Sequence, residues 1–92
     1  MEDRWADAVE KEALGRLSSV LLMLVESEGI MTREGSMIPT RYTYRQLSSM
    51  IGSNREAVTR AFSDLQEVVA VEVGSRQVYV RDSGVLRQTA GE

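Results

Sequence analysis

Hydrophobic residues near the N-terminus recur every three or four positions, the period of an amphipathic helix. The apolar positions of this stretch are Trp5, Val9, Ala13, Leu17, Leu21, Leu24 and Val25. We therefore predict a helix over residues 3–28, ended by Gly29. Gly15 lies inside the pattern and predicts an interruption of the rod.

The apolar stripe of this helix has two interpretations along its length. From Leu17 to Val25 it predicts packing against the core. From Trp5 to Leu14 it is also compatible with an exposed stripe that meets a second subunit.

The middle of the chain carries two helix-start patterns separated by a glycine. Thr43 with Gln46 has the form of a capping box, in which side chain and backbone satisfy each other's free N–H groups. Gly52 can adopt the left-handed conformation of a sharp helix exit. Ser53 with Glu56 repeats the capping-box form. Two short helices joined by a glycine turn predict a helix-turn-helix.

The second of these helices, expected over residues 54–66, sorts its residues by chemistry. At about 100° per residue, one arc holds Ala57, Val58, Ala61, Phe62 and Leu65. The opposite arc holds Arg55, Glu56, Thr59, Arg60 and Ser63. Arginine can pair with guanine and glutamate can accept from cytosine in the major groove of DNA. The polar arc therefore predicts contacts with DNA bases.

A second interpretation of the polar arc is a solvated face. Glu56 and Arg60 are four residues apart, and such an ion pair contributes only a few tenths of a kcal/mol. We expect Glu56 to cap the helix or to pair with Arg60 in the free protein, and to turn outward on DNA.

Short strands are expected on both sides of the two helices. Residues 30–36 are polar and predict a loop. Residues 37–41 predict a short edge strand, because Pro39 cannot occupy a central position. Two β-branched runs, 68–73 and 76–81, flank a Gly-Ser turn and predict a hairpin.

The tail from Asp82 predicts one apolar turn followed by fraying. The expected order is helix, strand, helix, helix and hairpin. It predicts an α+β, mainly α fold: a winged helix-turn-helix with a three-helix core and a small antiparallel β-hairpin wing.

The amino-acid composition excludes several kinds of functional site. A chain of 92 residues supports one domain. Without cysteine or histidine, disulfides, thiolate metal sites and histidine-based catalysis are excluded. The serines have no base beside them, so we expect no enzyme, no catalytic residue, no bound metal and no cofactor. The acidic start is unlike a signal peptide, and the apolar run 20–25 is too short to span a membrane.

Charge is distributed unevenly along the chain. The net charge is −3, which argues against a nucleic-acid partner when taken alone. Residues 1–28 hold three basic and seven acidic residues, a balance of −4. Residues 41–81 hold six arginines and four acids, a balance of +2. Because local charge sets the field that a phosphate backbone meets, the second segment is compatible with weak DNA binding.

From residue 14 to 90 the chain resembles the C-terminal DNA-binding domain of the cyclic-AMP receptor protein and its relatives, the Crp–Fnr family of bacterial transcription regulators. The resemblance rests on residues 14–17, Tyr42-Thr43, Leu47, Ile51-Gly52 and above all Asn-Arg-Glu-Ala-Val-Thr-Arg at 54–60. The last segment is similar to the family's Ser-Arg-Glu-Thr-Val signature followed by arginine. The chain departs from the family pattern at Asn54, where serine is usual, and at Val69, where glycine or asparagine is common.

The resemblance implies roles for individual residues. Base contacts are expected from Arg55, Glu56 and Arg60, with Thr59 on the same face. Phosphate contacts are expected from Thr43, Tyr44, Ser53, Asn54, Ser75 and Arg76, the last two at the wing tip.

The resemblance also implies an organisation and partners. Residues 1–16 correspond to the end of a dimerisation helix and 17–92 to the winged helix domain. The chain lacks the family's effector domain, so it is either an excised domain or a stand-alone one. Expected partners are double-stranded DNA, a second copy through the N-terminal helix, and RNA polymerase, in the cytoplasm and without a membrane. The alternative is a winged helix that binds another protein rather than specific DNA.

Overall fold

The architecture of the chain is a winged helix-turn-helix, seen in a computed structural model that describes residues 4–74 and 77–91, with side chains from residue 11 onward. The elements are α1 (Arg4–Glu28), β1 (Ile30–Thr32), β2 (Gly35–Ile38), α2 (Tyr44–Ile51), α3 (Arg55–Glu67), β3 (Val71–Gly74), β4 (Gln77–Val80) and α4 (Ser83–Thr89). The predicted class, mainly helical with a small antiparallel sheet, is confirmed.

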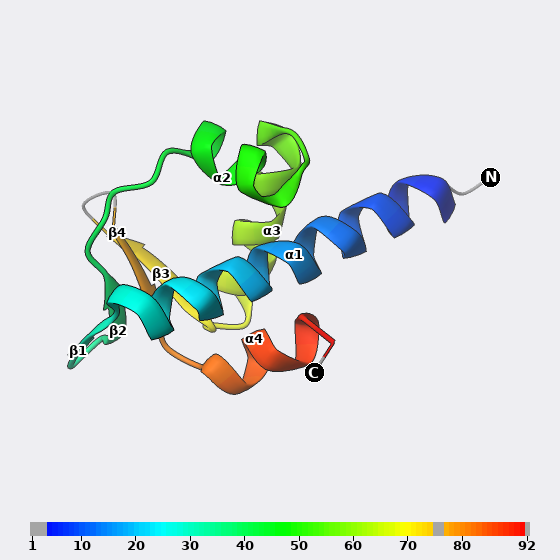
Figure 1. The fold of residues 1–92 in the computed structure, drawn as a ribbon. Coiled ribbons are helices and arrows are strands. Elements are labelled where there is room, and N and C mark those ends of the chain that lie inside the picture. The colour runs from blue at the N-terminus through cyan, green and yellow to red at the C-terminus, as the bar shows by residue number, and fades with distance from the viewer. Residues whose placement is uncertain (1–3, 75–76, 92) are drawn as a thin grey trace.

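Helix α1 runs through the middle of the molecule (Figure 1). Helices α2 and α3 pack on one side of it, α4 packs on the other, and the sheet lies near its C-terminal end. Leu17, Leu21 and Leu24 are buried, which confirms the core stripe predicted for this helix. The N-terminal end of α1 extends beyond the other elements, and the molecule measures 44 × 24 × 20 Å.

Two expectations about α1 and the tail are wrong. Gly15 does not interrupt α1, which is continuous. A Cβ at Gly15 would lie 3.0 Å from the backbone oxygen of Thr89, so the glycine permits α4 to approach closely. The tail forms α4 instead of fraying, because Leu86 is fully buried and the hydroxyls of Ser18 and Thr89 hydrogen-bond at 2.5 Å.

The sheet is larger than the sequence predicts. Its antiparallel order is β1-β2-β4-β3. Residues 30–36, expected as a loop, form most of a first hairpin, and β2 is central rather than an edge strand. Pro39 itself does not occupy a central strand position, because β2 ends at Ile38, one residue before it. The carbonyl of Pro39 accepts a hydrogen bond from Gln77 Nε2 at 2.9 Å.

The exit from α3 passes through a backbone conformation that suits few side chains. The predicted strand 68–73 begins only at Val71, and Val68 and Val69 form a turn before it. Val69 has φ +57°, the only positive φ of a non-glycine residue within 4–74 and 77–91. Because a β-branched side chain is strained in this region, the departure from glycine or asparagine at this position has a cost in stability.

We expect Val69→Asn to raise the free energy of unfolding by about 1 kcal/mol, because asparagine tolerates positive φ better than valine. Val69 is 61% exposed, so little packing is lost. Val68→Asn is the matched control, since Val68 is 58% exposed with φ −94°. Urea denaturation followed by circular dichroism measures both variants. An equal shift in the two would contradict strain at Val69.

Candidate nucleic-acid interface

The start and end of α2 have the predicted geometry. The Thr43 hydroxyl oxygen accepts from the Gln46 N–H at 3.0 Å, and Gln46 Oε1 accepts from the Thr43 N–H at 2.8 Å. Gly52 follows the helix with φ +67° and ψ +37°. Its N–H donates to the carbonyls of Ser48 and Ser49. The capping box and the left-handed turn are therefore confirmed.

The predicted capping box of Ser53 and Glu56 is wrong. The residue that caps α3 is Asn54, whose Oδ1 accepts from the Ala57 N–H at 2.8 Å. Glu56 is then the second residue of the helix, where the reciprocal capping-box contact is not formed. Its carboxylate lies in the first turn, near the positive end of the helix dipole.

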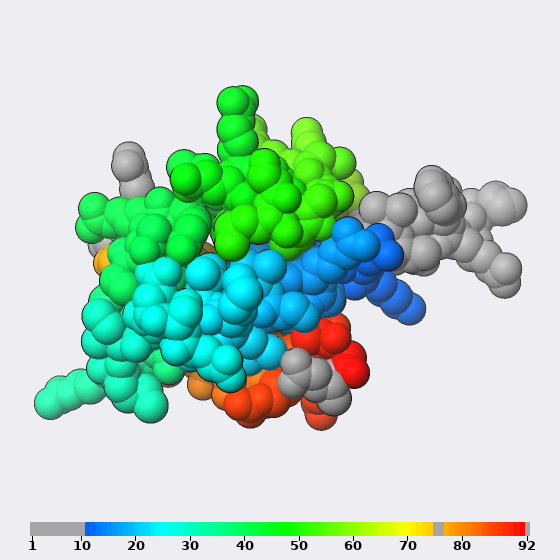
Figure 2. All heavy atoms as spheres, viewed as in Figure 1, coloured from blue at the N-terminus to red at the C-terminus, as the bar shows by residue number. Residues whose placement is uncertain are grey.

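Helix α3 divides its residues as the sequence predicts. The buried side chains are Val58, Ala61, Phe62 and Leu65. The side chains of the predicted polar arc, Arg55, Glu56, Thr59, Arg60 and Ser63, are all exposed, as are Asp64, Gln66 and Glu67 towards the end of the helix. The hydroxyl of Thr59 donates to the carbonyl of Arg55 at 3.0 Å, one turn earlier on the helix. Figure 2 shows α2 and α3 as a ridge on the side of α1 opposite α4.

An aromatic pair joins the two helices of the motif. The rings of Tyr44 and Phe62 stack with centroids 5.1 Å apart and planes 8° from parallel. Burial raises the pKa of the Tyr44 phenol. Since Phe62 belongs to the buried face of α3, the stack holds the first turn of α2 against the helix that presents the arginines.

The residues expected to contact phosphates lie in two groups. Thr43 and Tyr44 begin α2, whereas Ser53 and Asn54 precede α3. Thr43 and Asn54 are exposed, and Tyr44 and Ser53 are partly buried. Ser75 and Arg76 lie outside the described residues. Both groups are thus at helix starts, where backbone N–H groups favour anions.

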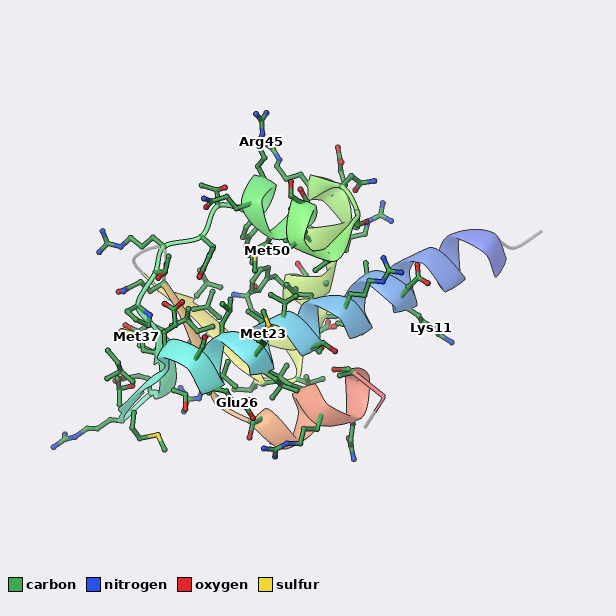
Figure 3. The ribbon with its side chains drawn as sticks, viewed as in Figure 1. Lys11, Met23, Glu26, Met37, Arg45 and Met50 are labelled. Carbon is green, nitrogen blue, oxygen red and sulfur yellow. The ribbon has the colours of Figure 1, made fainter. Side chains whose placement is uncertain are left out.

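Two arginines without a predicted role lie near the same surface. Arg41 and Arg45 are exposed, and Figure 3 shows Arg45 projecting away from α2. Charge counted over residues 41–63 alone gives four arginines against one glutamate, a balance of +3, so the remaining residues sum to −6. Counting charge over residues 41–63 instead of 41–81 would therefore have identified Arg41 and Arg45 from the sequence. Arg81 belongs elsewhere, because it pairs with Glu72 at 2.7 Å on the sheet.

A hydrogen-bond cluster holds the loop that leads into α2. The Glu28 carboxylate, at the end of α1, accepts from the hydroxyl of Thr40 at 2.5 Å and that of Tyr42 at 2.9 Å. These bonds hold the pKa of Glu28 below its ordinary value of 4.5, and the same contact raises the pKa of Tyr42. The cluster therefore ties the start of the motif to α1.

We expect Glu28→Gln to lower stability at neutral pH, because one amide oxygen cannot replace two carboxylate acceptors. A carboxyl group whose pKa is lowered by folding stabilises the fold above its unfolded pKa, and this contribution is lost as pH falls through the folded value. The difference in unfolding free energy between wild type and variant should be constant above about pH 5 and shrink towards pH 3. Denaturation at several pH values measures it.

Glu26→Gln is the control for this prediction. It removes the same charge from the same helix and leaves the acceptors of Thr40 and Tyr42 in place. An equal pH dependence in the two variants would contradict the role of the hydrogen bonds.

In the described part of the chain, the acidic side chains form no group of three that could hold a metal ion. Within the same residues, every helix is too short or too polar to cross a bilayer.

The chain is similar to known transcription regulators. Residues 15–89 match the family of Crp-like helix-turn-helix domains. A global nitrogen regulator of Synechococcus elongatus is 32% identical over 73 residues, 79% of this chain and 33% of that protein. The ycf28 protein of Porphyra purpurea, provisionally described as an HTH-type transcriptional regulator, is 35% identical over 78 residues, 85% of this chain and 33% of its own.

Solved structures share the fold. The catabolite activator protein of Thermus thermophilus superposes with a TM-score of 0.77 at 27% identity, over 94% of this chain and 37% of that one. The chain thus spans about a third of the length of the curated relatives that it matches.

Proposed function

Because this chain belongs to the family of Crp-like helix-turn-helix domains, we propose that it binds specific sequences of double-stranded DNA as part of a transcription regulator, with α3 inserted in the major groove. The observation that carries the proposal is the face of α3 on which Arg55, Glu56, Thr59 and Arg60 are exposed together, opposite the buried face. A helix-turn-helix presents its second helix to base edges in this way.

Each residue of this face has a role that its chemistry supports. Arg55 and Arg60 donate in pairs to O6 and N7 of guanine, and Glu56 accepts from N4 of cytosine. The Thr59 methyl contacts a thymine methyl. Asn54 keeps the helix start capped, so α3 reaches the groove already folded.

Phosphate contacts fix the register of α3. We assign them to the helix starts, through Thr43 and Tyr44 at α2 and Ser53 and Asn54 at α3, with Arg45 beside the first pair. Ser75 and Arg76 at the wing tip contribute to the neighbouring backbone. Such contacts position the protein and carry no sequence information. Since the charge balance of residues 41–63 is only +3, the domain neutralises few phosphates, so its affinity for DNA is modest and falls only moderately as salt rises.

The remaining partners follow from the same proposal. Two copies joined through the N-terminal part of α1 place two recognition helices on half-sites about one helical turn apart. The protein acts in the cytoplasm, without a cofactor in this chain, and contacts RNA polymerase through a face that DNA leaves free. The exposed Met23, Ile30 and Met31 lie on α1 and β1, away from α3.

Selection of binding sites from random DNA tests the proposal. The selected site, placed on a labelled duplex, is titrated with the full chain in a gel shift against a scrambled duplex of equal composition. We expect a preference of at least about tenfold for the selected site, below the roughly 10³–10⁷-fold typical of complete specific complexes, because a single domain makes few contacts. Equal binding of both duplexes, or none of either, would instead support a protein-binding winged helix.

A further inference from the structure

The seam between α1 and α2 is bridged by one arginine. An open groove of about 670 Å³ lies between these helices, and its walls include Gly15, Met50 and Gly52. Across it, Arg16 Nη1 of α1 donates to the backbone carbonyl of Ile51 at 3.1 Å. A side chain of α1 therefore holds the end of α2 across this groove.

The bond satisfies a carbonyl that the local chain leaves open. Ile51 is the last residue of α2, and the last four carbonyls of a helix have no partner within it. The N–H groups of Gly52 and Ser53 donate to the carbonyls of Ser48 and Ser49. No basic residue occupies the last turn of α2. The Arg16 guanidinium thus supplies both the donor and the positive charge that this helix end favours.

The guanidinium is itself oriented from α1. Its Nη2 lies 3.7 Å from Glu12 Oε1, one turn earlier on the same helix. With one nitrogen beside Glu12, the other points to the turn that joins α2 to α3. A Cβ on Gly52 would come within 3.4 Å of Nη1, so the guanidinium lies directly against the residue whose left-handed conformation sets the exit from α2.

We propose that Arg16 is a positioning residue for DNA binding, which fixes the direction of the helix-turn-helix relative to α1. The proposal rests on the proposed function for its consequence. If α1 joins two copies, the angle between α1 and α2 sets the separation of the two recognition helices. Arg16 then determines which half-site spacing the protein prefers, without touching DNA.

Two variants separate positioning from a general loss of charge. Arg16→Met removes the donors and keeps the aliphatic stem. Arg87→Met is the matched control, because it makes the same chemical change at an exposed residue of α4 that does not line the groove. Residual dipolar couplings of the backbone amides measure the orientation of α2 relative to α1. We expect them to change in Arg16→Met and to stay as in wild type in Arg87→Met.

Gel shifts on palindromes of different spacing then measure the consequence. At the preferred spacing, Arg16→Met should bind about threefold to tenfold more weakly than wild type, which corresponds to about 0.6–1.4 kcal/mol. At spacings one base pair longer or shorter the loss should be smaller, and on a single half-site there should be none. Arg87→Met should keep the spacing preference.

The outcomes of the two measurements are distinguishable. Unchanged couplings in Arg16→Met would overturn the proposal. Changed couplings with an unaltered spacing preference would overturn its role in DNA binding. If no protein, wild type included, prefers any DNA, the proposed function fails, while changed couplings would still assign the orientation of α2 to Arg16.

Discussion

Arg55→Ala and Arg60→Ala are each expected to weaken binding to the selected DNA site by about tenfold to a hundredfold. A bidentate arginine–guanine contact is worth about 1–3 kcal/mol of discrimination, and 1.4 kcal/mol is a factor of ten. Both side chains are exposed on α3, so removing them should leave the fold intact. Gel-shift titration gives the affinity, and thermal unfolding checks the fold.

The loss of a base contact and the loss of a phosphate contact change the affinity for DNA in different ways. Arg55→Ala and Arg60→Ala should each relax the preference at one base pair and lose little affinity for unrelated DNA. Arg45→Ala should weaken binding to all sequences alike and reduce the salt dependence, as expected of a phosphate contact. Arg33→Ala, in the exposed β1–β2 turn, is the control and should bind as wild type. A uniform loss in all four variants would contradict base recognition by α3.

Gly35→Ala is expected to lower the free energy of unfolding by about 3 kcal/mol or more. Gly35 begins β2 with φ +118°, a conformation that strains any other residue. A Cβ there would lie within van der Waals overlap of the Val80 carbonyl oxygen on β4. Strain and overpacking each cost about 1–3 kcal/mol, against a total of roughly 5–14 kcal/mol for a domain of this size. Urea denaturation measures the loss.

Gly91→Ala is the matched control for Gly35→Ala. Gly91 also has a positive φ, +89°, but a Cβ there meets nothing within 4 Å. It should cost about 1 kcal/mol or less, since only conformational strain near the chain end is added. Similar losses in the two variants would mean that the close approach of β2 to β4 contributes nothing.

Local patterns were sufficient where the structure is held by local bonds. The capping box of Thr43 and Gln46, and the left-handed turn at Gly52, depend on residues within a few positions of one another. The exposed and buried faces of α3 follow from the helical period alone. For this reason the helix-turn-helix and the outward direction of its arginines could be predicted, together with the family resemblance.

Long-range contacts explain the expectations that were wrong. From the local sequence, Gly15 predicts a break in the helix. The close approach of Thr89, 74 positions later, instead requires a glycine at this position. Residues 30–36 carry few β-forming residues, and they become strands because β2 pairs with β4. The wrong cap predicted for α3 has a local cause. Serine and asparagine are both good N-caps, and the turn between α2 and α3 is one residue longer than a Ser53 cap would require.

The amino-acid sequence by itself determined the helix-turn-helix, the capped start of α2 and the chemistry of the exposed face of α3, because these arise from bonds and periodicities within one or two helical turns. Only the tertiary structure decided how that face is held: the four-stranded sheet, the packing of α4 on α1, and the Arg16 contact with the end of α2. Each of these joins residues more than 30 positions apart, and the free energy of such contacts depends on a geometry that no short segment specifies.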